Sequence, residues 1–198
     1  MKRLMVTAVL LVGVAVVVVG MYISRRNQMV VMDQAVTGQW HQVDVVLQRR
    51  ADLIPNLVAT VKGYAAQEQA VFSDVDKARA GLLAAQAPMD RIAANQQLDG
   101  ALGRLLAVAE NYPQLKSNEN FLRLQDELAG TENRIAVERR RYNDLVRDYD
   151  TYVNLFPNNV FAHWAGFAPN NNYFIADESS RQAPVVNFSN TAPATQGK

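Results

Sequence analysis

An uncharged run of apolar residues near the amino terminus constrains the fold of this chain more than any other feature. It extends from Leu4 to Ile23 and spans 20 residues, which at about 1.5 Å per helical residue covers the roughly 30 Å hydrocarbon core of a bilayer. A cleaved signal peptide would have a shorter apolar region that ends at a small-x-small site. This run instead continues to Arg25 and Arg26, so the sequence predicts an uncleaved transmembrane anchor over residues 1–26. The basic residues on its two sides are balanced, which leaves the orientation in the membrane open.

Apolar residues after the anchor recur every three or four positions, which is typical of amphipathic helices. Three such series cover residues 36–82, 92–109 and 121–156. The sequence therefore predicts an all-α protein with a helical body over residues 27–168. Residues 169–198 are predicted to form an extended, partly disordered tail, because most of them are polar, aperiodic and interrupted by proline. The segment PVVNF is the exception, and it is expected to lie extended against the body.

Local signals predict where the helices start and stop. Asp90 follows a proline and is predicted to cap a helix that begins at Arg91. A residue before proline is pushed out of the helical region, so that helix should end before Pro113. Ser117 is predicted to cap the long last helix, which should extend to about Phe156.

Pro55 leaves two alternatives open. If Asp52 is an N-cap, Pro55 lies in the first turn of a new helix, where its missing amide hydrogen costs little. The chain then reverses near Asp52, and the residues after Phe156 return to the membrane. If one long helix continues through Pro55 with a kink, those residues lie at the far end of the body. The apolar spacing continues in register through Pro55, which favours the kinked helix. The cost of an interior proline, about 3 kcal/mol, favours the new helix, which we slightly prefer.

Several function classes lack support in this sequence. The formal net charge is +1 and the chain has no cysteine, so we expect no nucleic-acid partner, disulfide or thiolate metal site. His41 and His163 lie in no metal-binding or di-iron motif, and no phosphate loop or nucleophile elbow is present. We therefore expect a protein that is not an enzyme and has no cofactor, metal or catalytic residue.

Charged and polar residues lie on or beside the apolar series and form a candidate polar layer. Buried charges cost several kcal/mol each unless they are paired. The interpretation we favour is a set of salt bridges between helices that fixes their register, and the alternative is a layer that binds a ligand. If the helices pack antiparallel, Glu132 and Asn133 are expected to lie near Asn56 and to form an interhelical hydrogen-bond network with it. The candidate residues are Arg50, Glu68, Glu132, Asn133 and Arg139.

Two apolar stretches are candidates for contacts outside the helical core. The aromatic stretch from Phe156 to Phe174 includes Trp164, and it either caps the open end of the body or lies at the membrane interface. Capping is slightly favoured by the spacing. Met29 to Met32, which directly follow the anchor, are expected to be exposed and available for self-association.

The order and spacing of several blocks resemble the LemA family. These blocks are RRADLIPNLV, YPQLKSNENFLRLQ, TENRIAVERRRYN and FPNNVFAHWAGF, and the resemblance covers residues 1–188. It implies a single-pass bacterial membrane protein whose body is an antiparallel, up-and-down four-helix bundle, and it favours a helix start at Pro55. It implies no reaction, and it suggests other envelope proteins, such as membrane metallopeptidases, as companions.

Two hypotheses of function follow from these observations. The first is a non-enzymatic scaffold or adaptor in the bacterial cytoplasmic (inner) membrane, whose partners are the lipid bilayer and either a second copy or another envelope membrane protein. The second is a ligand-sensing bundle that uses the polar layer in envelope signalling.

Overall fold

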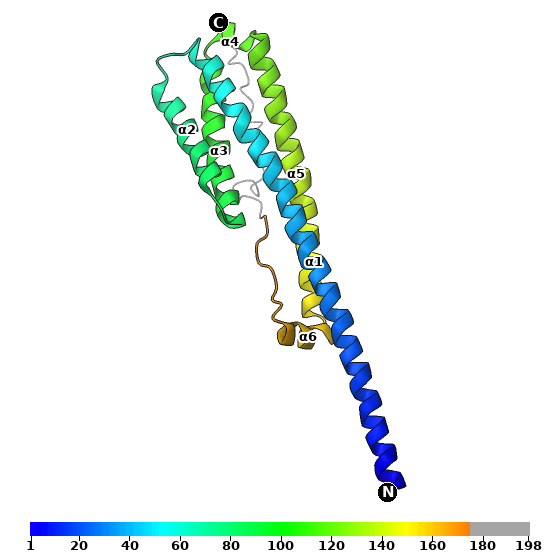
Figure 1. Ribbon diagram of the computed structural model, residues 1–198. Coiled ribbons are helices and arrows are strands. Elements are labelled where there is room, and N and C mark those ends of the chain that lie inside the picture. The colour runs from blue at the N-terminus through cyan, green and yellow to red at the C-terminus, as the bar shows by residue number, and fades with distance from the viewer. Residues whose placement is uncertain (175–198) are drawn as a thin grey trace, which may run out of the picture.

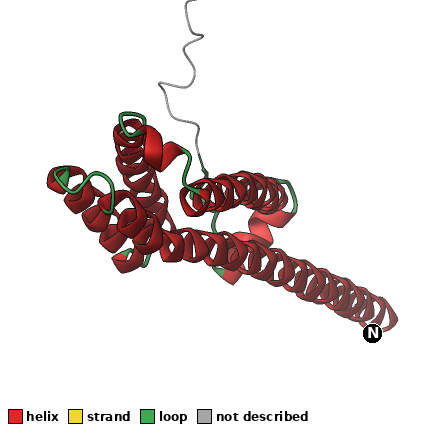
Figure 2. Cartoon of the chain, turned by 90° about the horizontal axis from the view of Figure 1, so that it is seen from above, coloured by secondary structure: helices red, strands yellow, loops and turns green. Residues whose placement is uncertain are grey.

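Six helices make up the part of the chain that the computed structural model describes, residues 1–174. They are α1 (Lys2–Lys62), α2 (Gln69–Ala84), α3 (Pro88–Ala109), α4 (Pro113–Lys116), α5 (Glu119–Asn154) and α6 (Asn158–Ala165). Over these residues no strand occurs (Figure 2), and the predicted all-α class is confirmed. The segment PVVNF lies outside the described residues.

Helix α1 continues through Pro55, so the prediction that a new helix begins after Asp52 is wrong. Proline has no amide hydrogen, which deprives the carbonyl four residues earlier, that of Ala51, of its helical donor. Arg79 of α2 replaces that donor, because its Nε donates to the Ala51 oxygen at 2.7 Å. Ala51 is fully buried, so this bond satisfies an oxygen that would otherwise have no partner. A neighbouring helix thus compensates for the interior proline.

The chain reverses after Lys62 instead of near Asp52. The backbone amides of Tyr64 and Ala65 both donate to the carbonyl of Val61, at 3.0 and 2.9 Å, and close the end of α1. Helices α2, α3 and α5 then run back, forward and back. The residues after Phe156 consequently lie beside the half of α1 that leads to the amino terminus (Figure 1). Neither alternative for Pro55 included a turn at this place, and the expectation that one long helix sends these residues to the far end is wrong.

Helices α1 and α5 form a long pair, and the α2–α3 hairpin packs beside the part of α1 farthest from the amino terminus (Figure 1). Two hydrophobic clusters form the core. The far cluster joins α1, α2, α3, α4 and α5, and it includes Ile54, Phe72, Leu98, Leu115 and Phe121. The near cluster joins α1, α5 and α6, and it includes Met29, Leu47, Ile135, Tyr142 and Phe161. Residues 4–19 of α1 are exposed and project beyond both clusters.

Two predicted helix starts are corrected by the structure. Helix α3 begins at Pro88, which occupies the first helical position, where its missing amide hydrogen costs nothing; Asp90 lies inside the first turn. Helix α5 is capped by Asn118, whose Oδ1 accepts from the amide of Phe121 at 3.1 Å. Ser117 instead donates back to carbonyls of α4.

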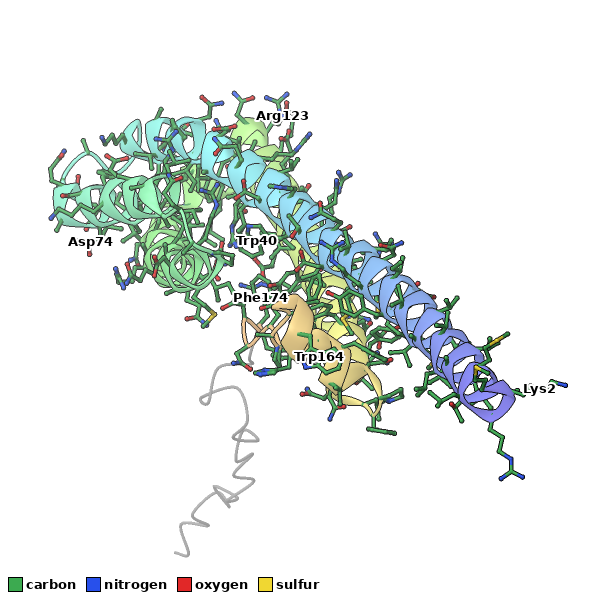
Figure 3. The ribbon with its side chains drawn as sticks, turned by 60° about the horizontal axis from the view of Figure 1, so that its bottom comes forward. Lys2, Trp40, Asp74, Arg123, Trp164 and Phe174 are labelled. Carbon is green, nitrogen blue, oxygen red and sulfur yellow. The ribbon has the colours of Figure 1, made fainter. Side chains whose placement is uncertain are left out.

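Residues 168–174 run along α5, although the sequence assigned most of them to the tail. The Oδ1 of Asp150 accepts from the amide of Asn170, and its Oδ2 accepts from the hydroxyl of Tyr173, both at 2.7 Å. Asn143 exchanges two hydrogen bonds with the backbone of Phe174, at 2.8 and 3.0 Å. The ring of Phe174 stacks on Trp40, with 5.9 Å between the ring centroids, and Figure 3 shows the two residues side by side.

Candidate functional site

Arg50 of α1 is the centre of a charged cluster between the helices. It is only 7 % exposed, and it lies in sequence between Leu47 of the near cluster and Ala51 of the far cluster. Its Nη2 lies 2.6 Å from Asp99 of α3, and its Nη1 lies 2.5 Å from Glu132 of α5. One guanidinium thus connects α1 to two other helices, which matches its planar arrangement of several donors.

Asn95 and Arg139 complete this charged cluster. Asn95, one turn before Asp99 on α3, accepts from Arg50 at 3.4 Å and donates to the Asp99 carboxylate at 3.1 Å. Burial raises the pKa of the Asp99 carboxyl above its usual value, and the charge of Arg50 opposes that rise. Burial also lowers the pKa of Arg139, while the charges of Glu132 and Asp99 oppose the change. One buried and one half-buried arginine therefore face two carboxylates, and the loss of hydration at Arg139 and Asp99 is partly offset by charges of opposite sign.

The structure brings together three of the five predicted polar-layer residues, Arg50, Glu132 and Arg139. Glu68 is not among the described partners of Arg50, because the turn after Lys62 interrupts the helical spacing that linked the two residues; it occupies the N-cap position of α2. Asn133 is exposed, as is Asn56, so the expected network between them is wrong. Asn133 lies about 100° around the helix from Glu132, which turns it away from α1.

Asn95 and Asp99 were not predicted to belong to the polar layer, although their spacing could have indicated it. Asn95 lies three residues from both Ile92 and Leu98, so it occupies a place in the apolar series, and Asp99 follows four residues later on the same face.

A second buried ion pair was also missed. Arg91 of α3 pairs with Asp44 of α1, and its Nη1 donates to the carbonyls of Leu82 and Ala85, at 3.3 and 3.2 Å. These carbonyls lie at the end of α2, so Arg91 caps that helix while it holds α3 against α1.

A groove of about 610 Å³ opens beside the charged cluster. Residues of α1, α3 and α5 line it. Leu57, Leu102, Leu106 and Leu128 provide apolar walls, and Arg50, Asp99 and Glu132 provide charge. Apolar walls with a few convergent polar groups are common in ligand sites. Among residues 1–174, no three histidine or acidic side chains are grouped so that they could hold a metal ion.

The predicted anchor residues lie at the opposite end of the body. Helix α1 contains a segment long and apolar enough to cross a membrane, with a mean hydropathy of 2.8 and no buried residue. Leu4 and Ile23 are exposed, and Arg26 is also exposed. Arg25 is half-buried, and its Nη1 donates to the hydroxyl of Tyr152 at 3.4 Å. This geometry is consistent with a membrane protein whose body begins at the end of the apolar segment.

The aromatic stretch divides into packed and exposed residues. Phe161 is buried and lies edge-to-face with Tyr22 of α1, with 6.1 Å between the ring centroids. Tyr173 and Phe174 pack against the near cluster. Trp164 is 66 % exposed and Phe156 is 82 % exposed, so capping of the body accounts for only part of the stretch.

The residues that follow the anchor also differ from expectation. Met29 is fully buried in the near cluster, whereas Val31 is 61 % exposed. Met29 faces α5 and α6 because α1 is already paired at this level. Only part of the Met29–Met32 stretch is therefore free for contact.

These features define an all-helical protein with an exposed apolar segment at its amino terminus and a charged cluster in its core. The chain belongs to the LemA family, whose model matches residues 39–188. It is 30 % identical to magnetosome protein MamQ 2 of Paramagnetospirillum magneticum, over 83 % of this chain and 69 % of that protein. It is 26 % identical to magnetosome protein MamQ of Magnetospirillum gryphiswaldense, over 73 % of this chain and 63 % of that protein. Protein LemA of Metamycoplasma hominis is 22 % identical, over 71 % of this chain and 65 % of that protein.

Proposed function

We propose that this chain is a single-pass, non-enzymatic scaffold or adaptor of the bacterial inner membrane, which either self-associates or docks another envelope protein. The observation that carries the proposal is the continuity of α1. The same helix contains the exposed apolar segment and contributes Met29, Leu47 and Ile54 to the core of the body. A body joined to its anchor in this way is held at a set distance from the bilayer, as a scaffold requires.

We also infer that α1, α2, α3 and α5 form an antiparallel four-helix bundle beyond Arg50. The far cluster supports this inference because all four helices contribute buried side chains to it. Arg50 and Arg91 support it as well, since each connects helices through ion pairs at the base of the cluster. The groove beside Leu102 and Leu128 is then the place where a partner helix would bind.

In-cell photo-crosslinking tests the scaffold proposal. A photo-reactive residue is placed at Val31, which is exposed where Met29 is buried, and in a second variant at Gln125 in the groove. Arg140, exposed on α5, is the control position for random collision. Crosslinks to a second copy support self-association, and crosslinks to a different envelope protein support an adaptor. Crosslinks no more frequent than those from Arg140 would count against both.

The groove also favours a second candidate function, a sensor for a small ligand. Its leucine walls and the carboxylates of Asp99 and Glu132 are suited to an amphiphilic cation. Dodecyltrimethylammonium is a simple probe of that class. A bound ligand stabilises the folded state by mass action, so the probe should raise the melting temperature of the wild type more than that of E132Q. E127Q, an exposed carboxyl on the same helix, should respond as the wild type does, and an equal response of all three would reject this candidate.

A further inference from the structure

The end of the body nearest the apolar segment presents uncovered hydrophobic side chains. Helix α5 ends at Asn154, and the chain turns into α6. Four residues of this region, which we call the α6 ledge, are exposed although large and apolar. They are Leu155, Phe156, Val160 and Trp164.

Contacts with α1 show how far along the axis of α1 the α6 ledge lies. Arg25 bonds to Tyr152, and Tyr22 contacts Phe161. Because α1 and α5 are antiparallel, each residue after Tyr152 lies one step closer to the amino terminus of α1. Leu155 and Phe156 therefore lie about 5 Å beyond Tyr152 along the axis, level with Tyr22. This is the level at which the apolar run of α1 ends, just before Arg25 and Arg26.

The composition of the α6 ledge differs from that of the neighbouring helix. Residues 154–167 contain no aspartate, glutamate, lysine or arginine, whereas residues 138–150 of α5 contain many charges. Val160 and Trp164 lie one helical turn apart and share a face, while Phe161 and Ala162 turn inward and are buried. Helix α6 thus has one apolar face on the near cluster and another that is exposed and that no residue among 1–174 covers.

We propose that the α6 ledge lies in the interfacial layer of the bilayer that α1 crosses, with Phe156, Val160 and Trp164 in contact with lipid. Tryptophan and other aromatic residues are enriched in this layer, and short amphipathic helices lie in its plane. The ledge adds a second attachment beside α1 and fixes the tilt and rotation of the body above the membrane. This inference rests on the anchor in the proposed function. Figure 1 shows α6 at the end of the body opposite α4, beside the half of α1 that leads to the amino terminus.

Tryptophan fluorescence of the full chain in phosphatidylcholine liposomes tests the proposal. The chain has two tryptophans, so W40F reports Trp164 alone and W164F reports Trp40 alone. Trp40 lies about 25 Å farther along α1 than Ile23, which makes it a control outside the bilayer. Phospholipids brominated near the headgroup end of the chain should quench W40F more than phospholipids brominated near the chain terminus. Neither lipid should quench W164F.

A third variant separates failure of the ledge from failure of the anchor. V12W in the W40F and W164F background places the probe in the middle of the apolar run. Lipids brominated near the chain terminus should quench it most. If these lipids do not quench V12W, the anchor and the ledge proposals are both overturned. If they quench V12W but Trp164 is quenched only by aqueous iodide, the anchor proposal stands and the ledge proposal is overturned. A third result is that neither brominated lipid nor iodide quenches Trp164, and that this protection increases with the protein-to-lipid ratio. That result would also overturn the ledge proposal, and it would indicate that a second copy of the chain covers the ledge.

Surface substitutions provide a second readout that leaves the core intact. F156S with V160S, added to W40F, removes two of the proposed lipid contacts. We expect the emission of Trp164 to shift to longer wavelength and its quenching by lipid to fall, with unchanged circular dichroism. L122S, which alters an exposed leucine of α5 at the far end, is the matched control. Equal lipid quenching of Trp164 in both variants would count against the proposal.

Discussion

Arg79 and Pro55 act as a pair at the scale of single residues. The Nε of Arg79 supplies the hydrogen bond that Pro55 denies to the buried carbonyl of Ala51. We expect R79M to destabilise the protein by about 1–3 kcal/mol, the cost of leaving a buried acceptor unsatisfied. For a chain of this size each kcal/mol lowers the melting temperature by about 2–4 °C, which circular dichroism in mild detergent would detect.

A double substitution tests the coupling between the two residues. In P55A the backbone amide at this position can donate to Ala51, so R79M should cost less in P55A than in the wild type. K77M is the control, because Lys77 is exposed on the same helix and its side chain makes no hydrogen bond to another residue among 1–174. Equal costs of R79M in both backgrounds would contradict the pairing.

The ionisation of Asp99, another single residue, should make the stability of the protein depend on pH. Burial raises its pKa in the folded state, so the folded protein binds this proton more tightly than the unfolded chain does. The free energy of unfolding of the wild type, relative to D99N, should therefore increase as the pH falls from 7 to about 4. Chemical denaturation at several pH values measures this difference. D126N, from the same groove, controls for net charge, and a difference independent of pH would contradict the prediction.

The residue scale also shows what the sequence could not reveal. Arg50, Glu132 and Arg139 were predicted because charges interrupted an apolar spacing. Arg79 gave no such signal: its role depends on which carbonyl of α1 lies opposite α2, and this is a property of the packed fold. Glu68 was misassigned because the spacing was extended across the turn after Lys62, which contains no proline and whose Gly63, at the end of α1, was not taken as a helix stop.

At the scale of elements, residues 168–174 are held along α5 by a few side chains. Asn143 donates to and accepts from the backbone of Phe174. N143A removes both bonds, so we expect faster amide hydrogen exchange at residues 170–174 and loss of the stacking between Phe174 and Trp40. Mass spectrometry of the exchanged protein measures the first effect, and Trp40 emission in a W164F background measures the second.

N133A is the matched control for N143A, since Asn133 is an exposed asparagine of the same helix. Unchanged exchange in N143A would mean that the aromatic contacts suffice to hold the segment. The sequence could not predict this attachment, because residues 168–174 read APNNNYF, with no helical or strand period, and their partners lie far away in the sequence on α5 and α1.

At the scale of the whole molecule, α1 joins the apolar segment to the body without a break. We expect spin labels at V17C and Q34C to give a narrow distance distribution centred near 26 Å, from about 1.5 Å per residue. The chain has no native cysteine, so the labels need no background substitutions. Pulsed electron resonance in liposomes measures the distribution.

The pair Q34C and R49C is the control, because both positions are on the part of α1 that packs against α5. A V17C–Q34C distribution much broader than that of the control would indicate a hinge between anchor and body. The helical period correctly predicted that the body is built of helices, and the uncharged run correctly predicted an exposed apolar segment at the amino terminus. The period continued in register through Pro55 and favoured one long helix. The local cost of an interior proline outweighed it in the prediction, because the sequence does not show that a side chain of another helix compensates for that cost.

The length of α1 also separates the protein into two electrical environments. Arg50 lies about 40 Å along the helix from Ile23, whereas the Debye length at physiological ionic strength is about 8 Å. In the proposed membrane placement, the surface potential of anionic lipids is screened before it reaches the Arg50 cluster, while Arg25, Arg26 and the α6 ledge lie within it. We therefore expect a change in lipid headgroup charge to act on one end of this molecule and to leave the ionisation of the other end unaltered.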